Sequence, residues 1–84
     1  MTSIDQRVIA LGKEIRDHAE RQDVSLTDLA KRAGISRATL YNWLDGERAM
    51  PLTGLSAIAD VLRVPEYELL HDAEERARRD ARTV

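Results

Sequence analysis

The sequence predicts an all-α protein with five helices. In five segments, apolar residues recur every three or four positions, a spacing that gathers them on one face of a helix. The alternation of polar and apolar residues that is typical of a half-buried strand does not occur. Proline, glycine or a capping serine separates the later segments. We therefore expect a small bundle of helices joined by short connections.

The composition limits the possible class of protein. A chain of 84 residues suffices for one domain, and with only 4% aromatic residues its core must be aliphatic. The absence of cysteine excludes disulfides and thiolate metal sites and fits a reducing cytoplasm. No apolar run approaches the roughly 18 residues of a membrane span, and no signal-peptide pattern opens the chain. We expect a cytoplasmic protein without membrane contact.

The charge is slightly acidic but unevenly distributed. The net charge is −2, and residues 1–65 hold nine basic and nine acidic residues, so the acidic excess lies in the tail. A neutral domain can bind DNA when its cations cluster on one face. We expect weak non-specific binding to nucleic acid and a modest salt dependence.

The first helix is expected from about Ile4 to about Arg21, with Ser3 as its cap. Gly12 would cost about 1 kcal/mol relative to alanine if it is exposed. Ile9 lies off the apolar stripe and is expected to be exposed. The stripe consists of Ile4, Val8, Leu11 and Ile15.

Residues 25–46 carry the most informative pattern. Two short helices, Leu26–Ala33 and Arg37–Leu44, are expected because Ser25 and Ser36 can accept hydrogen bonds from the free amides of an opening helix turn. Gly34 permits the positive φ of a tight turn between them. The apolar faces consist of Leu29, Ala30 and Ala33 on the first helix and of Leu40, Trp43 and Leu44 on the second, with Ile35 filling the gap between them. This is the pattern of a helix-turn-helix, whose second helix can enter the major groove of DNA.

A fourth helix is expected over Leu52–Leu62, after Gly46 has ended the third and with Pro51 at its start. Its apolar face consists of Leu52, Leu55, Ile58, Ala59 and Leu62. Pro65 separates it from a fifth helix that begins near Glu66 and contributes Leu69 and Leu70 to the core.

The end of the chain, residues 72–82, is almost entirely charged residues and alanine. Opposite charges stand four apart, and each pair adds about 0.2–0.5 kcal/mol to an isolated helix. The pairs are Asp72–Arg76, Glu74–Arg78, Glu75–Arg79 and Arg76–Asp80. We expect this helix to project alone, or to fray after about Arg78. The chain is therefore divided into a helix-turn-helix domain, residues 1–71, and a charged C-terminal helical extension, residues 72–84.

This order of helices resembles the lambda-repressor-like family of Cro/C1 and XRE-type DNA-binding domains. The resemblance covers about Leu11 to Leu70 and rests on Leu29, Ala30, Gly34, Ile35, Ser36, Leu40, Trp43, Gly46, Pro51, Ile58, Ala59, Leu62 and Leu69. It implies a five-helix lambda-repressor-like bundle. It also implies a sequence-specific regulator of transcription that binds double-stranded DNA, most simply a repressor.

The sequence departs from the family pattern at two places. Leu26 stands where the family often has a glutamine that steadies phosphate contacts, so one phosphate contact is in doubt. Leu44 stands where the family often has a glutamate paired with an arginine of the first helix, and Ala19 occupies the partner position. Replacing a buried ion pair by packing can be neutral or stabilising.

The resemblance places residues 36–45 in the major groove. Arg37 can donate two hydrogen bonds to guanine, and Asn42 can bond adenine in the same bidentate way. Ala38 can touch a thymine methyl or leave space, and Tyr41 can meet a base or a phosphate. A solvated arginine and an exposed helix aromatic are the alternatives for Arg37 and Tyr41. The candidates for base reading are Arg37, Ala38, Tyr41 and Asn42.

Phosphate contacts are expected from the openings of helices, where free amides and the helix dipole favour anions, and from the loop beyond the recognition helix. The candidates are Ser25, Thr27, Ser36, Thr39, Arg48 and Thr53, with Lys31 and Arg32 as weaker ones. Trp43 could stack on bases, but its place on the apolar face predicts that it belongs to the core.

An enzyme is not expected. His18 and His71 are isolated in the sequence, and no metal-binding histidine pair or phosphate-binding glycine loop occurs. We therefore expect no catalytic residue, no metal site and no cofactor. The remaining alternative is a helix-turn-helix used for protein contact, as in an antitoxin or an adaptor, with residues 72–84 as the arm that binds the partner.

The expected partner is double-stranded DNA with a palindromic or pseudo-palindromic operator. One recognition helix reads only a few base pairs, so two copies must share a site. Ala73, Ala77 and Ala81 would permit close approach of two fifth helices, but they bury little apolar area. We expect a weak homodimer or a DNA-assisted dimer, associated with the nucleoid.

Overall fold

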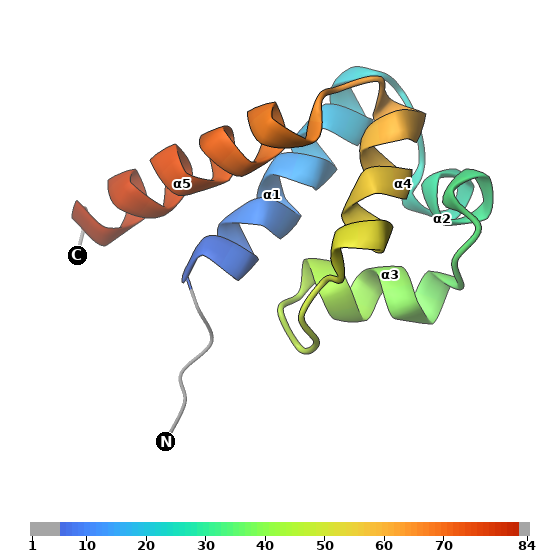
Figure 1. The fold of residues 1–84 in the computed structure, drawn as a ribbon, viewed down its shortest axis with the longest axis horizontal. Coiled ribbons are helices and arrows are strands. Elements are labelled where there is room, and N and C mark those ends of the chain that lie inside the picture. Colours follow the sequence, from blue (N-terminus) through green and yellow to red (C-terminus); the bar gives the residue numbers. More distant parts are fainter. Residues whose placement is uncertain (1–5, 83–84) are drawn as a thin grey trace.

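A computed structural model describes residues 6–82, which form five α-helices and no strand (Figure 1). The helices are α1 (Gln6–Arg21), α2 (Leu26–Ala33), α3 (Arg37–Leu44), α4 (Leu52–Leu62) and α5 (Glu66–Arg82). The all-α prediction is confirmed, and the bounds of α2, α3 and α4 are those expected. The expected start of the first helix at Ile4 and its cap Ser3 lie outside the described residues.

The turns around α2 and α3 form as their residues predict. Ser25 Oγ accepts a hydrogen bond from the Asp28 amide at 3.0 Å, and Ser36 Oγ accepts one from the Thr39 amide at 3.0 Å. Gly34 ends α2 with φ 76°, and Gly46 follows α3 with φ 78°. A side chain strains this left-handed backbone, so glycine is the favoured residue at both turns, although Arg63 adopts the same conformation at the end of α4.

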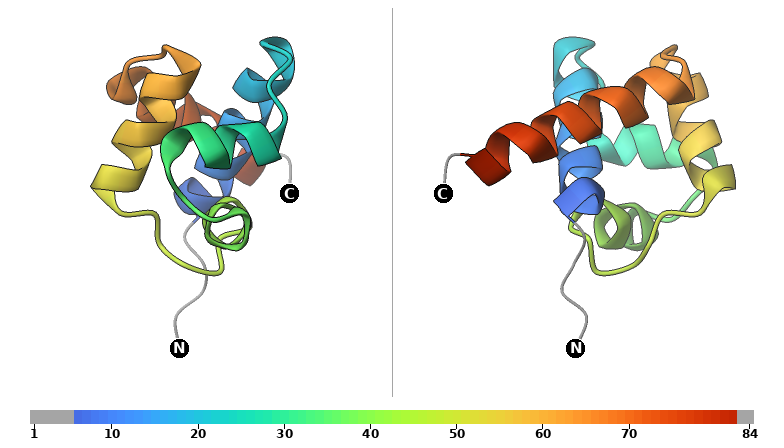
Figure 2. Two further views of the ribbon diagram at one scale, coloured as in Figure 1. Left: turned by 90° about the vertical axis from the view of Figure 1, so that its right-hand side faces the viewer. Right: turned by 60° about the vertical axis from the view of Figure 1, so that its left-hand side comes forward.

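The core lies between α1 and the group formed by α2, α3 and α4. Helix α5 crosses the face of α1 that points away from α2 and α3 (Figure 2). The completely buried large side chains of the core come from all five helices: Ile15, Leu29, Leu40, Ile58, Leu62 and Leu69. The predicted core position of Trp43 is confirmed, since only 9% of this residue is exposed. Gly54 lies against the indole, because a Cβ atom there would come within 2.6 Å of ring atoms of Trp43.

Several expected burials are wrong. Leu52 is 69% exposed because the first turn of α4 extends beyond the core, and Leu70 is 43% exposed because it lies about 100° around the helix from the buried Leu69. On α1, the expected exposure of Ile9 is also wrong: Ile9 and Val8 are both half-buried. Ala10, which the expected stripe omitted, is buried because α5 covers it.

At Gly12 the backbones of α1 and α3 come into direct contact. A Cβ atom on Gly12 would lie 2.1 Å from the backbone oxygen of Leu44 and 3.0 Å from its Cα atom. The residue is buried, so the cost of about 1 kcal/mol that was expected for an exposed glycine does not apply. Glycine at this position lets α1 touch the backbone at the end of α3.

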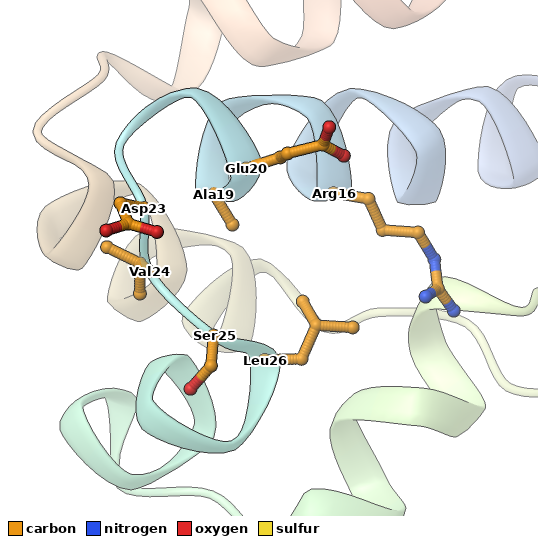
Figure 3. Close-up of a pocket in the computed structure, with 7 residues that line it drawn as sticks. All are labelled: Arg16, Ala19, Glu20, Asp23, Val24, Ser25 and Leu26. Carbon is orange, nitrogen blue, oxygen red and sulfur yellow. The ribbon is translucent and has the colours of Figure 1, made fainter.

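A hollow separates the end of α1 from the start of α2 (Figure 3). Its volume is about 450 Å³, and it is lined by Arg16, Ala19, Glu20, Asp23, Val24, Ser25 and Leu26. Leu26, at the position where the resembled family often has glutamine, packs half-buried against the core. Ala19 and Leu44 are both buried in that core, so packing occupies the two positions at which the family often has an ion pair.

The expectation that the last helix projects alone is wrong. α5 is continuous through Arg82 and packs across α1, where Ala73 and Ala77 bury against Ala10 and the half-buried Leu11. Small side chains at Ala73 and Ala77 allow this close packing within one molecule, so these residues are not available to a second copy. The division of the chain after residue 71 stays a prediction.

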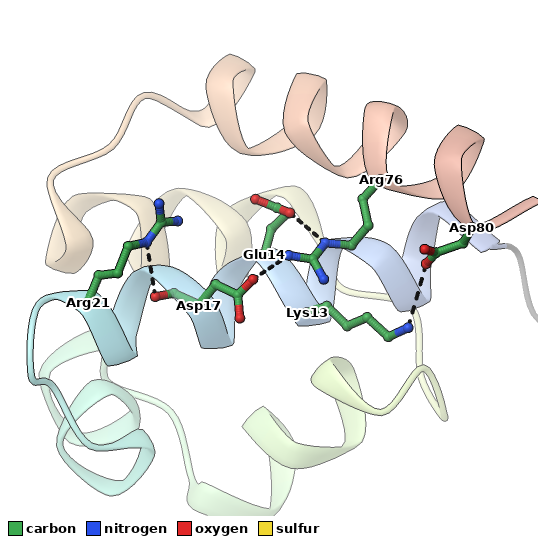
Figure 4. Close-up of polar contacts among 6 residues, drawn as sticks. All are labelled: Lys13, Glu14, Asp17, Arg21, Arg76 and Asp80. Atoms are coloured by element: carbon green, nitrogen blue, oxygen red, sulfur yellow. Dashed lines mark hydrogen bonds and ion pairs between the residues drawn. The ribbon is translucent and has the colours of Figure 1, made fainter. Parts of the chain in front are cut away.

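Ion pairs between helices accompany this packing (Figure 4). Arg76 donates from Nε to Glu14 at 2.6 Å and from Nη2 to Asp17, and Lys13 lies 3.6 Å from Asp80. The expected partners of Arg76 within α5 are thus wrong, because α1 places two carboxylates within reach. Glu14 is only 6% exposed. Its hydrogen bond raises the pKa of Arg76 above the ordinary value, against an opposing effect of burial.

Replacing Gly12 by alanine should destabilise the protein by about 1–3 kcal/mol, because the new methyl group meets backbone that cannot rotate away. The gain in helix propensity, about 1 kcal/mol, does not offset this clash. Urea unfolding followed by circular dichroism measures the change. The control is Glu20→Ala, an exposed site on the same helix, which should stay within about 0.5 kcal/mol. Equal stability of the two variants would refute the close contact.

Replacing Trp43 by alanine should cost about 3–5 kcal/mol, since a large buried side chain is lost. Tyr67→Ala is the control, because Tyr67 is 74% exposed and its loss should be nearly neutral. Trp43 is the single tryptophan, so native fluorescence reports on it alone. Its emission should be blue-shifted and resist quenching by iodide, and free quenching in the folded protein would rule out the buried position.

Candidate nucleic-acid interface

Helix α3 lies at one edge of the molecule, with the other helices on one side of it (Figure 1). Leu40, Trp43 and Leu44 face the core. The four candidates for base reading occupy the accessible side: Arg37 and Ala38 are exposed, and Tyr41 and Asn42 are half-buried. Their spacing, two adjacent residues repeated after one turn, places them on a common face.

The opening turns of α2 and α3 lie together. Arg37 Nη1 is 3.5 Å from Thr27 Oγ1, at the limit of a hydrogen bond. Thr27, which is exposed, therefore lies beside the Arg37 side chain, while the exposed Ser25 caps α2. One side chain proposed for phosphate contact is thus brought beside the first side chain proposed for base contact.

The Ser36 hydroxyl is already used within the protein. Its oxygen accepts from the Thr39 amide, and it donates to Thr39 Oγ1 at 2.8 Å. Because the Ser36 hydroxyl donates its hydrogen bond to Thr39 Oγ1, the hydrogen of the Thr39 hydroxyl remains free to donate to a ligand outside the protein. Of the two residues, Thr39 is the better donor to a phosphate, and Ser36 serves the helix as its cap.

The loop after α3 is held by the end of the helix itself. The Asn42 carbonyl accepts hydrogen bonds from the amides of Glu47 at 2.9 Å and Arg48 at 3.2 Å. Arg48 is exposed, and Thr53 is exposed in the first turn of α4. Phosphate candidates thus lie at both ends of α3: Thr27 beside Arg37 at its start, and Arg48 beyond its end.

Arg16 is a residue that the sequence analysis missed. Its Nη2 atom donates to Asp45 Oδ1 at 2.9 Å, and its guanidinium carbon lies 5.8 Å from the centre of the Tyr41 ring, within the range of a cation–π contact. An arginine of α1 thus pairs with a carboxylate after Leu44 and not with position 44. In the sequence, the only signal for the Arg16–Asp45 pair is the acidic residue directly after Leu44.

Positive charge remains available on this side of the protein. Within residues 6–82, Arg37, Arg48 and Lys31 form no ion pair. Arg32, by contrast, lies 3.5 Å from Asp28 one turn away, which supports α2. The hollow beside Ser25 is a poor anion site, because Glu20 and Asp23 both line it. Arg37 in the first turn of α3 and Arg48 beyond its end fit a negatively charged partner such as a polyanion better than a basic or apolar one.

Among the described helices, none is both long and apolar enough to cross a membrane.

The chain is similar to one family model and to two solved structures. The sequence matches the family model of a helix-turn-helix domain over residues 10–71, which is more than half of the chain. No curated protein matches the sequence. A crystal structure of the clp gene regulator ClgR from Corynebacterium glutamicum superposes with a TM-score of 0.89 at 20% identity, covering 96% of this chain and 86% of that one. A second structure of ClgR from the same organism gives 0.78 at 21% identity, covering 86% and 94%.

At these identities the ClgR structures show a shared fold, and the family match extends from the second turn of α1 into α5. The match includes both helices around Gly34 and also Gly12, which contacts the end of α3. The protein belongs to the helix-turn-helix domain family.

Proposed function

We propose that this protein is a sequence-specific regulator of transcription that binds double-stranded DNA with residues 36–45 in the major groove. The observation that carries the proposal is the two-sided character of α3. One side is anchored in the core by Leu40, Trp43 and Leu44, and the other presents Arg37 and Asn42 to solvent. The structurally similar ClgR is named as a gene regulator, which adds support.

In the proposed complex, Arg37 donates to O6 and N7 of a guanine, and Asn42 bonds an adenine edge. Ala38 contacts a thymine methyl, and Tyr41 contacts a base or phosphate. Arg16 limits the positions of Tyr41 by lying over its ring. The phosphate contacts on either side come from Ser25, Thr27, Thr39, Arg48 and Thr53, and they fix the depth and register of α3 in the groove. Ser36, whose hydroxyl donates to Thr39, supports this set by capping α3 and orienting Thr39.

Repression is the simplest regulatory role. Occupying the operator is enough to repress, whereas activation requires a further contact with the transcription machinery. Since one α3 reads only a few base pairs, we propose a palindromic or pseudo-palindromic operator with half-sites about 34 Å apart. With Ala73 and Ala77 buried inside the molecule, assembly on DNA is favoured over a stable free dimer. The protein would then act in the cytoplasm, at the nucleoid.

A helix-turn-helix used for protein contact is the second candidate. The observation that favours it is a mostly apolar hollow of about 340 Å³ between α1 and α5, lined by Arg7, Val8, Leu11, Leu70, Ala73 and Glu74. An antitoxin or an adaptor could bind its partner there. The hollow lies away from α3, so both uses could coexist in one protein.

Selection from a random pool of duplexes tests the proposal. The full-length protein should enrich a short consensus, which gel shifts with the selected duplex then confirm. Two inverted half-sites with centres about 34 Å apart would support binding by two copies. Failure to enrich any sequence, with binding that vanishes at moderate salt, would argue against a DNA regulator and favour the protein-contact candidate.

Replacing Arg37 by alanine should weaken specific binding by about 1–3 kcal/mol and relax the preference at one position of the consensus. Arg48→Ala is the matched control, since it removes an arginine proposed to contact phosphate. It should weaken binding to all sequences alike. It should also reduce the slope of the logarithm of the binding constant against the logarithm of salt concentration by about 1, because one phosphate contact is lost. Repeating the selection with each variant separates the two effects. An unchanged consensus with Arg37→Ala would show that Arg37 does not read a base.

A further inference from the structure

A cluster of three potential metal ligands lies between α1 and α5, on the face of α1 opposite Gly12. Glu14 and His18, one turn apart on α1, and Asp72 on α5 each offer one ligand atom, and these atoms lie within 4.8 Å of one another. Residues four apart share a helix face, so α1 presents its two ligands side by side. The third comes from the helix packed across it.

His18 provides an independent observation. Its Nε2 atom is shielded from solvent and forms no hydrogen bond within the described part of the chain, although the residue as a whole is only partly buried. A shielded polar nitrogen without a partner is costly and uncommon in a folded protein. An imidazole nitrogen is also the commonest protein ligand of transition metals. A bound cation would satisfy this atom.

The carboxylate of Glu14 is already oriented. Arg76 binds its Oε2 atom at 2.6 Å, which fixes the side chain and leaves the other oxygen for an ion. Such outer hydrogen bonds commonly hold metal-binding carboxylates in position. The same guanidinium binds Asp17, so Arg76 is anchored twice (Figure 4).

The surroundings favour a cation. The hollow that contains the cluster is lined by Glu14, His18, Arg21, Glu68, Asp72, Glu75 and Arg79. Four carboxylates therefore face the two lining arginines and Arg76, which binds Glu14, so one acidic group remains in excess. Glu68 and Glu75 stand one turn on either side of Asp72. A divalent ion would reduce the repulsion among these carboxylates.

We propose that Glu14, His18 and Asp72 bind a divalent transition-metal ion, with Zn²⁺ as the best fit. One imidazole and two carboxylates suit Zn²⁺ better than Ca²⁺ or Mg²⁺, which prefer oxygen ligands alone. Zinc binds such atoms at about 2.0–2.2 Å, so tetrahedral ligands lie about 3.4 Å apart. The site would form if side-chain rotations shortened the distances between ligand atoms by up to about 1.4 Å, from the present limit of 4.8 Å. Water would complete the coordination.

The ion would join α1 to α5 and so stabilise their packing. This inference does not depend on DNA binding, because the cluster lies on the opposite face of α1 from the contact with α3. No metal was expected from the sequence, because it contains no cysteine and no histidine pair with metal-binding spacing. Asp72 is distant from His18 in the sequence, and only the crossing of α5 over α1 brings the two together.

Titration of the full-length, chelator-treated protein with ZnCl₂ tests the site, with calorimetry for stoichiometry and thermal unfolding for stability. We expect one ion per chain and a rise in the unfolding temperature. His18→Ala and Asp72→Asn should each lower the zinc affinity by at least about tenfold and abolish the temperature rise. The matched controls are His71→Ala, which removes the other, exposed histidine, and Glu74→Gln on α5. Both should bind zinc like the parent.

Asp72→Asn keeps the shape of the side chain, and circular dichroism without zinc verifies that both ligand variants fold. If His18→Ala does not fold, His18→Gln takes its place. The proposal is overturned if the parent binds no zinc below millimolar concentration, or if either ligand variant binds zinc as tightly as the parent. It is also overturned if the His71→Ala control loses binding to the same extent.

Discussion

The contact between Gly12 of α1 and the backbone of Leu44 determines how α3 is presented. Because a methyl group at position 12 would lie 2.1 Å from the Leu44 oxygen, the two helices can approach this closely only with glycine. The contact lies at the end of α3, next to Asp45, which pairs with Arg16 of the same helix α1. One steric and one ionic contact thus fix α3 against α1, and the side of α3 that bears Arg37 stays free.

Two opposite faces of α1 serve different purposes. One face, with Gly12 and Arg16, positions α3 and the proposed DNA surface. The other face, with Ala10 and Glu14, binds α5 through alanine packing and the hydrogen bond to Arg76. A change in the packing of α5 can reach α3 through α1, or through α4 and α2, which also connect the two helices. A metal ion between α1 and α5 would join two helices that carry none of the proposed base contacts, so its direct effect would be on stability.

Local features of the sequence were enough to predict α2, α3 and α4, because their ends depend on nearby residues such as Ser25, Ser36 and Gly34. The buried position of Trp43 follows from its spacing relative to Leu40 and Leu44. The proposed DNA residues rest on that same local frame, which is why the accessible side of α3 could be named in advance. The individual base and phosphate contacts stay predictions.

The features that could not be predicted are contacts between residues far apart in the chain. The charged pattern of α5 also fits a solvated helix, and only the approach of Ala73 to Ala10 shows that it packs. Arg76 has acidic residues four positions away on both sides, yet Glu14 and Asp17 bind it because α1 lies closer to the guanidinium. The roles of Gly12 and Arg16 could not be predicted for the same reason. Gly12 contacts Leu44 and Arg16 pairs with Asp45, and the sequence of α1 does not show that the end of α3 lies beside it.

Nuclear Overhauser contacts across the α1–α3 junction test the central claim most directly. In the folded protein, the α-protons of Gly12 should show strong cross-peaks to protons of Leu44, because the backbones meet there without an intervening side chain. Helical chemical shifts for residues 37–44 would show in the same experiment that α3 is formed. Absence of these cross-peaks from a protein with an intact α3 would contradict the account, since α3 would then be held by some contact other than Gly12.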